Sequence, residues 1–223
     1  HTGAKVGIHN FISFGTIIAG SFNFSPQSVF LGLRYHLFKI FPKKLNANLR
    51  SYQKTGYNWL KGLEDYKLGG ILADDMGLGK TIQILAAILF YKERNKLENR
   101  PSLIIVPPTL ISNWENEIKK FTPELSYYIY HGSNRTYPLE EYDIILTSYG
   151  VVRLDLDLFL DETWLLCVID EAQNIKNPKS KQTLAIKSLR AKNYVALSGT
   201  PIENYLSEYW SIFDFINKLR INP

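Results

Sequence analysis

The stretch GGILADDMGLGKT, residues 69–81, joins an apolar run to residue types that bind phosphate. Gly77 and Gly79 allow backbone N–H groups to converge on phosphate oxygens, and Lys80 supplies a positive charge for the β and γ phosphates. Thr81 offers a hydroxyl to Mg²⁺, and the helix expected to begin here adds a dipole that favours anions. On these residues alone, a glycine-rich turn that merely caps a strand is the alternative.

A pair of carboxylates, Asp170 and Glu171, follows another apolar run about 90 residues later. One carboxylate at such a strand end can hold the water shell of Mg²⁺, and its neighbour can orient and polarise an attacking water. A solvated strand end is the alternative for such a pair taken alone. With a phosphate loop upstream and a later strand that ends in Ser-Gly-Thr, the pair predicts nucleotide hydrolysis.

Five short apolar runs are expected to form the strands that position these residues. The predicted strands are residues 69–74, 102–107, 142–148, 165–170 and 194–199, and the two clearest helical patterns are residues 80–95 and 112–121. Strands so rich in Ile, Leu and Val suit a parallel sheet covered on both faces, so we predict an α/β fold with a doubly wound, mostly parallel sheet. Ligands of such sheets bind at the carboxyl ends of the strands, where both motifs stand.

The net positive charge belongs to the first part of the chain. The 223 residues carry a formal charge of +5, yet residues 1–63 hold eight Lys or Arg and no Asp or Glu. The other 160 residues hold 18 basic and 21 acidic side chains, a balance of −3. Charge alone therefore does not predict nucleic-acid binding by the part that carries the motifs.

Cysteine content and hydropathy narrow the class of protein further. The single cysteine, Cys167, excludes a disulfide framework within this chain and fits a reducing compartment. A spanning helix needs about 20 mainly apolar residues. The uncharged stretch 10–33 is interrupted by Gly, Ser, Asn, Gln and Pro26, so no membrane span is expected there.

Six segments, in chain order, carry a resemblance to a known family. They are LRSYQKTGYNWL, ILADDMGLGKTIQ, LIIVPPTLISNWENEIKKF, DIILTSYGVV, VIDEAQNIKNPKSK and ALSGTPIENYLSEYWSIFDF. Together they resemble the first RecA-like lobe of the Swi/Snf-type ATPases, which are helicase-like DNA translocases of superfamily 2, over residues 45–217. In that family the loop reads D-x-M-G-L-G-K-T. Asp74, which stands where the usual phosphate loop has its first glycine, is therefore identified as a family variant.

The resemblance implies ATP and Mg²⁺ as cofactors and gives roles to individual residues. Gln53 resembles the glutamine that reads the adenine edge, a task that suits an amide because it donates and accepts together. A surface glutamine on an amphipathic helix is the alternative. Lys80, Asp170 and Glu171 are the implied catalytic residues, and Thr81 and Asp170 the implied Mg²⁺ ligands. The implied nucleotide-binding residues are Gln53, Asp75, Met76, Gly77, Leu78, Gly79, Lys80 and Thr81.

A second set of residues is implied to contact DNA or to couple DNA to the nucleotide. Thr109, Ser112 and Asn113 stand near the expected start of a helix, where polar groups can contact a phosphate without reading sequence. Helix capping is the alternative for the same side chains. Gln173 occupies a position where the family more often has histidine. The full set is Thr109, Ser112, Asn113, Thr147, Ser148, Gln173, Ser198, Gly199 and Thr200.

Three aromatic residues near the motifs are expected to serve the structure rather than the chemistry. Trp114, Ile118 and Phe121 form an i, i+4, i+7 stripe, which is typical of the buried face of a helix. Trp210 lies in a similar pattern and is expected to be buried as well. His131 is expected in a turn, and the four histidines and one cysteine show no metal-ligand spacing.

The sequence therefore predicts the ATP-binding lobe of a DNA-dependent ATPase that moves along double-stranded DNA. The resemblance implies three partners: double-stranded DNA, a second RecA-like lobe and a DNA-bound protein complex. It also implies a nucleoid-associated cytoplasmic location in a prokaryote or a nuclear location in a eukaryote. Two alternatives remain open on the residues: a phosphate-loop small-molecule kinase, and a nucleotide-dependent binding module that does not hydrolyse.

The start of the chain lacks the alternation of strands and helices. It faintly resembles the end of a phospholipase D-type domain, because Gly20, Ser21 and Asn23 match a Gly-Ser-x-Asn motif. His1 and Lys5 are spaced by three residues where that domain has one, so we assign no catalysis to it. The expected division is an N-terminal extension at 1–44, the lobe at 45–217 and the start of a linker at 218–223.

Overall fold

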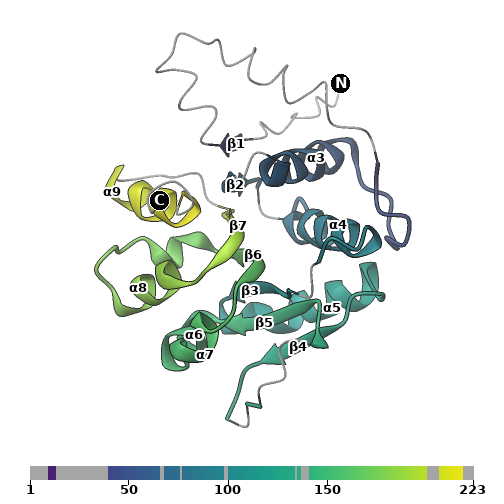
Figure 1. The fold of residues 1–223 in the computed structure, drawn as a ribbon. Coiled ribbons are helices and arrows are strands. Elements are labelled where there is room, and N and C mark those ends of the chain that lie inside the picture. Colours follow the sequence, from purple (N-terminus) through teal and green to yellow (C-terminus); the bar gives the residue numbers. More distant parts are fainter. Residues whose placement is uncertain are drawn as a thin grey trace.

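A mostly parallel sheet runs through the centre of the molecule (Figure 1). The computed structural model describes residues 10–13, 40–65, 68–75, 77–97, 100–133, 135–136, 141–199 and 206–217. The strands within them are β1 (Asn10–Ser13), β2 (Gly70–Ala73), β3 (Ser102–Val106), β4 (Tyr127–Tyr130), β5 (Ile144–Ser148), β6 (Trp164–Ile169) and β7 (Ala191–Leu197). Their order is β1–β2–β7–β6–β3–β5–β4, and β1 alone among these strands is antiparallel to its neighbour.

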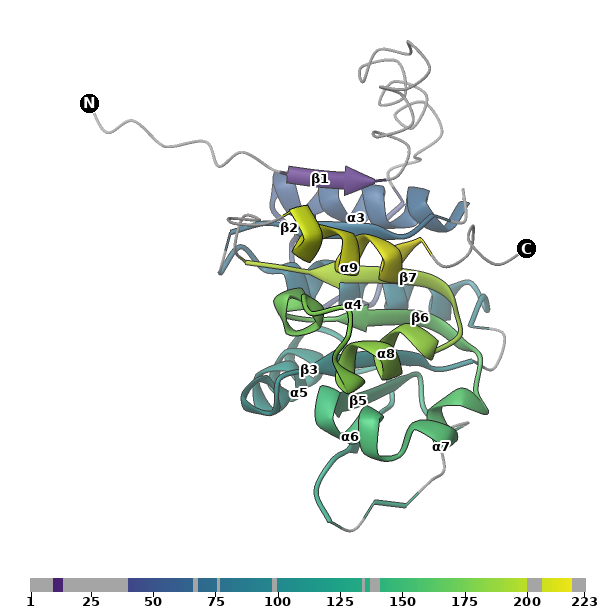
Figure 2. The ribbon, with the colours of Figure 1, turned by 90° about the vertical axis from the view of Figure 1, so that its left-hand side faces the viewer.

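Helices cover both faces of this sheet. The helices are α3 (Ser51–Asp65), α4 (Lys80–Glu93), α5 (Ile111–Phe121), α6 (Tyr149–Leu154), α7 (Leu156–Leu160), α8 (Lys181–Ser188) and α9 (Leu206–Ile216), with 3₁₀ turns η1 (Pro108–Leu110) and η3 (Ala172–Ile175). Figures 1 and 2 show α3, α4 and α5 on one face and α6 to α9 on the other. The prediction of a doubly wound α/β sheet is confirmed.

Two apolar clusters, one on each face, explain why the central strands are so apolar. Along β3, Ile104 and Val106 pack under α4 and α5, whereas Leu103 and Ile105 pack toward α6 to α9. Successive side chains of a strand point to opposite faces, so a strand covered twice needs apolar residues at every position. This is the reason that the sequence of the central strands reads as unbroken Ile, Leu and Val.

The buried faces of the helices agree with one prediction and correct another. Trp114 is 1% exposed and packs with Ile118 in the core, as the stripe on α5 predicted. The prediction that Trp210 is buried was wrong, because its side chain is 62% exposed. The buried face of α9 is formed by Ile212, Phe215 and Ile216. Trp210 lies off that face, with its ring set edge-on against the ring of Phe213.

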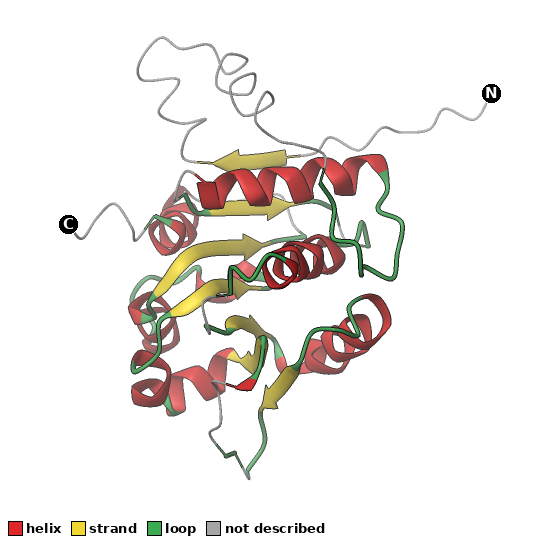
Figure 3. Ribbon diagram, turned by 45° about the vertical axis from the view of Figure 1, so that its right-hand side comes forward, coloured by secondary structure: helices red, strands yellow, loops and turns green. Residues whose placement is uncertain are grey.

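The sequence did not predict β1 and β4, the two outermost strands of the sheet, which Figure 3 draws in yellow. β4 is half-buried along Tyr127, Tyr128 and Ile129, so it lacks the continuous apolar run that marked the other strands. β1 adds to the outer edge of β2, with Asn10 opposite Ala73. Both strands lie at the edges of the described sheet. An edge strand has a neighbouring strand on one side only, so it is less buried than a central strand.

Residues 40–44 lie against the α3 and α4 face. The hydroxyl of Tyr57 donates to the carbonyl oxygen of Ile40 at 2.9 Å, and the backbone N–H groups of Lys43 and Lys44 donate to the Glu93 carboxylate at 3.0 and 2.8 Å. The residues behind the phospholipase D-type resemblance, His1, Lys5, Gly20, Ser21 and Asn23, lie outside the described residues.

Candidate active site

The loop before α4 has the backbone that a phosphate site requires. Gly77 and Gly79 have φ values of 79° and 77°, in the left-handed region that glycine enters at low cost. α4 begins directly after Gly79, and no side chain caps its first turn. The N–H groups of that turn are thus left for another acceptor, and an anion is the natural one.

Lys80 lies folded over this loop. Its Nζ donates to the carbonyl oxygens of Asp74 at 2.8 Å and Asp75 at 3.3 Å. A lysine in the first turn of a helix is opposed by the helix dipole, so helix stability does not explain its presence there. An ammonium group beside free helix N–H groups does suit a bound phosphate. Met76, another residue of the predicted set, lies outside the described residues.

Asp74 has a structural part in the loop. It is 2% exposed, and its Oδ2 accepts a hydrogen bond from Nε2 of Gln83 at 3.1 Å. The same Gln83 nitrogen donates to the carbonyl oxygen of Gly79 at 3.2 Å. The residue that replaces the first glycine therefore ties the end of β2 to α4. Within the loop, the N–H of Leu78 donates to Asp75 at 3.3 Å.

Gln53 reaches the loop from α3. Its Oε1 accepts from the backbone N–H of Arg50 at 2.9 Å, and its Nε2 donates to the carbonyl oxygen of Leu78 at 3.1 Å. The side chain is 9% exposed, so the alternative of an ordinary surface glutamine is wrong. The amide is held beside the phosphate loop, where an adenine base would have to lie for Gln53 to read it.

The two loop glycines make a matched pair for mutation. A Cβ at Gly79 would lie 2.6 Å from Nε2 of Gln53, whereas a Cβ at Gly77 would meet nothing within 4 Å. In both alanine variants a residue with a Cβ must adopt left-handed backbone, which lowers the free energy of unfolding by about 1–2 kcal/mol. Gly79→Ala must also displace the Gln53 amide, so we expect its free energy of unfolding to fall by roughly 1 kcal/mol more. Urea denaturation of the two variants measures this difference, and equal losses would contradict the packing described.

Asp170 follows β6 at the carboxyl end of the sheet and is held by three groups. Its Oδ2 accepts from the indole N–H of Trp114 at 2.8 Å, and its Oδ1 accepts from the N–H of Glu171 at 2.9 Å. The hydroxyl of Tyr149 donates to its carbonyl oxygen at 2.7 Å. Burial raises the pKa of the Asp170 carboxyl, while the Trp114 hydrogen bond and the charge of Lys80 lower it. The structure thus brings the loop lysine and the strand-end carboxylate into one site.

Glu171 has a strained backbone. Its φ of 52° and ψ of 60° are left-handed, which costs a non-glycine residue about 1–2 kcal/mol. The side chain of Asn174 donates to the Glu171 carbonyl oxygen at 2.8 Å, and Nε2 of Gln173 donates to its Oε2 at 2.7 Å. Strain of this kind collects at functional sites. Gln173, where the family more often has histidine, still contacts the carboxylate.

Glu117 is a residue of the site that the sequence analysis did not single out. Burial raises the pKa of its carboxyl, hydrogen bonds from Asn113 and Thr81 lower it, and the charge of Asp170 raises it. The Nδ2 of Asn113 lies 3.3 Å from its Oε1. The i, i+4 spacing of Asn113 and Glu117 on a helix that follows a strand end was the available signal. What the sequence lacked was the position of α5 beside α4.

The hydrogen bond between Trp114 and Asp170 gives a second prediction. Trp114→Phe removes a donor to a buried carboxylate, so we expect it to lower the free energy of unfolding at neutral pH by about 1.5–3 kcal/mol beyond the loss of packing. The bond stabilises the ionised form of Asp170. The loss should therefore shrink as the pH falls through the raised pKa of that carboxyl.

Trp164 is a matched control for this variant. It is fully buried, and its indole N–H donates to the carbonyl oxygen of Phe159 at 3.2 Å, which does not titrate. Urea denaturation of the 223-residue chain between pH 4 and 8 should show a pH-dependent loss for Trp114→Phe and a constant loss for Trp164→Phe. Parallel curves would contradict the role given to Trp114.

The donor groups fit Mg²⁺ only together with a nucleotide. No group of three His, Cys, Asp or Glu side chains within the described residues could hold a metal. Mg²⁺ in phosphoryl-transfer sites keeps several waters and takes one or two protein ligands plus phosphate oxygens. The hydroxyl of Thr81 and the carboxylate of Asp170, which both influence the pKa of the Glu117 carboxyl, would form such a minimal set.

The residues predicted to contact DNA divide into exposed and buried ones. Thr109 on η1, with Ser112 and Asn113 in the first turn of α5, are exposed. Thr147, by contrast, is fully buried, and its hydroxyl donates to the carbonyl oxygen of Tyr130 at 2.8 Å, so it is not one of the exposed polar groups. Its position within β5 between two neighbouring strands explains the burial.

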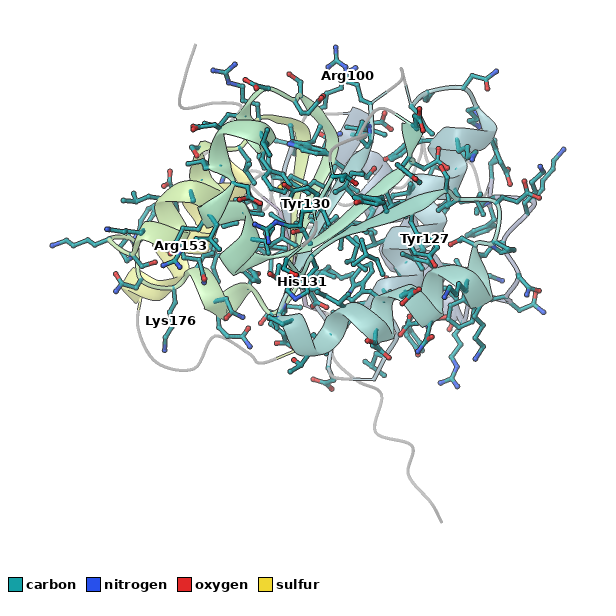
Figure 4. All side chains as sticks on the ribbon, turned by 90° about the horizontal axis from the view of Figure 1, so that it is seen from below. Arg100, Tyr127, Tyr130, His131, Arg153 and Lys176 are labelled. Atoms are coloured by element: carbon teal, nitrogen blue, oxygen red, sulfur yellow. The ribbon has the colours of Figure 1, made fainter. Side chains whose placement is uncertain are left out.

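Ser148 and Ser198 stand at strand ends but are themselves buried. Ser148 is 2% exposed, and its Oγ lies 3.2 Å from Nδ1 of His131, an exposed residue directly after β4 (Figure 4). The backbone N–H of Ser198 donates to the carbonyl oxygen of Leu72 at 3.2 Å. Gly199 is partly exposed beyond it, and Thr200 lies outside the described residues.

The sequence of the chain matches one family model and several known proteins. The model of the family described as SNF2-related domain matches residues 52–221. YwqA of Bacillus subtilis, which carries the name of an ATP-dependent helicase/translocase, is 46% identical over 178 residues, covering 77% of this chain and 19% of that protein. The TATA-binding protein-associated factor MOT1 of Saccharomyces cerevisiae is 42% identical over 194 residues, covering 80% of this chain and 10% of its own length.

A solved structure matches as well. The Sulfolobus solfataricus SWI2/SNF2 ATPase core in complex with dsDNA superposes with a TM-score of 0.76 at 44% identity, over 81% of this chain and 38% of that one. The chain thus spans between 10% and 19% of the two curated relatives, and 38% of the solved core.

Proposed function

The chain belongs to the SNF2-related domain family, and on this premise we propose that it is the ATP-binding lobe of a motor that moves along double-stranded DNA. The observation that carries the proposal is the placement of Lys80, at the start of α4 after β2, and Asp170, directly after β6, at the carboxyl end of one mostly parallel sheet, where the charge of Lys80 lowers the pKa of Asp170. A phosphate loop and a strand-end carboxylate pair in that relation serve ATP hydrolysis.

The site would work through groups that are already fixed. Lys80 exchanges the carbonyl oxygens of Asp74 and Asp75 for the β and γ phosphates, and the free N–H groups of α4 bind the same anion. Thr81 and Asp170 would hold Mg²⁺, which when bound neutralises charge on the phosphates. Glu171 orients and polarises the attacking water. Trp114 keeps Asp170 ionised and in place, because its N–H stabilises the carboxylate.

The nucleic-acid surface in this proposal is the exposed start of α5. Ser112 and Asn113 offer a hydroxyl, an amide and helix N–H groups, which suit a phosphate of the DNA backbone and carry no sequence information. Thr109 on the preceding turn adds a further hydroxyl. The solved relative with duplex DNA supports this choice of polymer.

The proposal includes partners outside the lobe. Arginines that stabilise transition-state charge would come from a second RecA-like lobe. We also propose that the chain divides into an extension at 1–44, the lobe at 45–217 and the start of a linker at 218–223. The relative MOT1 is named a TATA-binding protein-associated factor, which supports a DNA-bound protein as a partner of the motor. No helix in the described parts of the chain has the length and apolar character needed to cross a membrane.

Polymer dependence of the ATPase rate tests the proposal. We expect duplex DNA to stimulate hydrolysis by the intact protein strongly, and single-stranded DNA or RNA to do so weakly, all at one fixed salt concentration. Stimulation by single strands alone would leave the ATPase assignment in place, but the proposed polymer would then be single-stranded nucleic acid rather than duplex DNA. No stimulation by any polymer would overturn the motor and favour the binding module that does not hydrolyse. Membership of the family already argues against a small-molecule kinase.

A further inference from the structure

A side chain from α4 joins the two ends of the phosphate loop. Nε2 of Gln83 donates to Oδ2 of Asp74 at 3.1 Å and to the carbonyl oxygen of Gly79 at 3.2 Å. An amide nitrogen carries two hydrogens, so these two acceptors use both of them. Asp74 directly follows β2, and Gly79 directly precedes α4. Gln83 therefore braces the loop across its whole length, and these two hydrogen bonds are called the brace below.

The brace acts on a peptide whose N–H group faces the proposed phosphate site. In a trans peptide the carbonyl oxygen and the N–H of the next residue point in opposite directions. A bond that holds the Gly79 carbonyl oxygen toward α4 therefore holds the N–H of Lys80 pointing out of the start of the helix. Gln53 holds the preceding peptide through the carbonyl oxygen of Leu78 at 3.1 Å. No side chain caps this turn, so its N–H groups suit an anion.

Stability alone does not explain a glutamine at position 83. Gln83 is fully buried, and its Oε1 has no hydrogen-bond partner among the described residues. Asp74 beside it is 2% exposed. Exchanging the two ends of the amide would not help, because Oε1 would then face two acceptor oxygens. A buried polar atom without a partner lowers stability, and a pair of apolar side chains would avoid that loss. The polar pair therefore points to a role in ligand binding.

We propose that Gln83 is a positioning residue that holds the phosphate loop in its nucleotide-binding shape before the nucleotide binds, with Asp74 as its anchor. The inference rests on the proposed function, which supplies the nucleotide as the ligand. A loop that is fixed in advance loses less conformational freedom on binding, so the phosphates bind more tightly. Asp74, in the place of the first glycine of the usual loop, then supplies the acceptor that the brace requires.

Nucleotide binding by the intact protein tests the brace. The Kd of a non-hydrolysable fluorescent ATP analogue with Mg²⁺ is measured without DNA. Gln83→Met keeps the length of the side chain and removes both hydrogen bonds, so we expect the Kd to rise about ten- to thirtyfold. The KM of the ATPase should rise with it, while kcat stays within about twofold, because the residues that act on the attacking water are untouched.

Two further variants serve as controls for Gln83→Met. Asp74→Asn keeps an acceptor oxygen for Nε2 of Gln83, so its Kd should stay within about threefold of the original. Thr122→Val removes a buried hydrogen bond of the same kind away from the loop, since the Thr122 hydroxyl donates to the carbonyl oxygen of Ile118 at 3.2 Å. It should lower stability and leave the Kd unchanged.

The double variant Asp74→Ala/Gln83→Met separates positioning from stability. Each single substitution leaves one buried polar partner behind, so each should lower the free energy of unfolding in urea. The double variant removes both partners, so stability should recover, whereas the Kd should stay as weak as in Gln83→Met because the brace is absent from both.

Two results would overturn the inference: a Kd in Gln83→Met within about twofold of the original, or a Kd that recovers together with stability in the double variant. An unmodified protein that binds the analogue without stimulation of its ATPase by duplex DNA would overturn the motor and leave the brace in place. An unmodified protein that binds no nucleotide would overturn both.

Discussion

Replacing Glu171 by glutamine is expected to lower the DNA-stimulated ATPase rate of the intact protein by about 10²–10⁴-fold, with the Kd for ATP changed only a few-fold. Glutamine keeps the size of the side chain and an acceptor for Nε2 of Gln173, now 2.7 Å from Glu171. It removes the negative charge that polarises the attacking water. The separation of rate from binding is the signature of a group that acts on the reaction rather than on the ground state.

The control for this prediction is a glutamate away from the site. Glu141→Gln changes the same charge at an exposed position before β5 and should leave the rate and the Kd unaltered. Steady-state hydrolysis with duplex DNA and equilibrium binding of a fluorescent ATP analogue supply the two numbers. A Glu171→Gln protein that turned over ATP within threefold of the original would remove Glu171 from the proposed chemistry.

Lys80→Ala should remove nucleotide binding while leaving the fold intact. Charge-assisted hydrogen bonds contribute about 1.5–3 kcal/mol each, so the loss of the phosphate contacts should weaken the Kd for ATP by roughly a hundredfold or more. Lys80 contacts the carbonyl oxygens of Asp74 and Asp75 and stands at the positive end of α4. Removing Lys80 also removes these two hydrogen bonds, but it relieves an unfavourable dipole interaction at the start of the helix, so we expect the two effects to offset and stability to hold.

The two measurements for Lys80→Ala must move apart to support this account. Titration calorimetry should show the loss of ATP binding, and urea denaturation should show an unchanged free energy of unfolding. Lys96→Ala is the matched control, because Lys96 is an exposed lysine just beyond the other end of α4. Nucleotide binding that survives in Lys80→Ala would contradict the assignment of the phosphate loop.

The sheet was predictable because a strand that is buried on both faces has apolar residues at every position. Five strands followed from runs such as LIIV and LLCVI, and β4 escaped because its tyrosines are half-buried at the edge. Trp210 shows the opposite error. Apolar residues occur all around α9, so the helical pattern alone does not show which of them face the core. The buried face is formed by Ile212, Phe215 and Ile216, and Trp210 lies outside it.

The site was predictable as a list of residue types and not as a set of contacts. The loop and the carboxylate pair are local motifs, so they could be read directly. Trp114 and Asp170 are 56 residues apart, and nothing in either segment reveals that they share a hydrogen bond. Glu117 and the burial of Thr147 likewise depend on which helix and strand lie next to them. Tertiary neighbours supplied these corrections.

Displacement of a third strand from duplex DNA tests the central claim, ATP-driven movement along a double helix, most directly. A DNA triplex with a duplex extension is mixed with the intact protein and ATP, and release of the third strand is followed. We predict release that requires ATP, is lost in Glu171→Gln and leaves the duplex strands paired. ATP hydrolysis stimulated by duplex DNA but without release of the third strand would contradict the account.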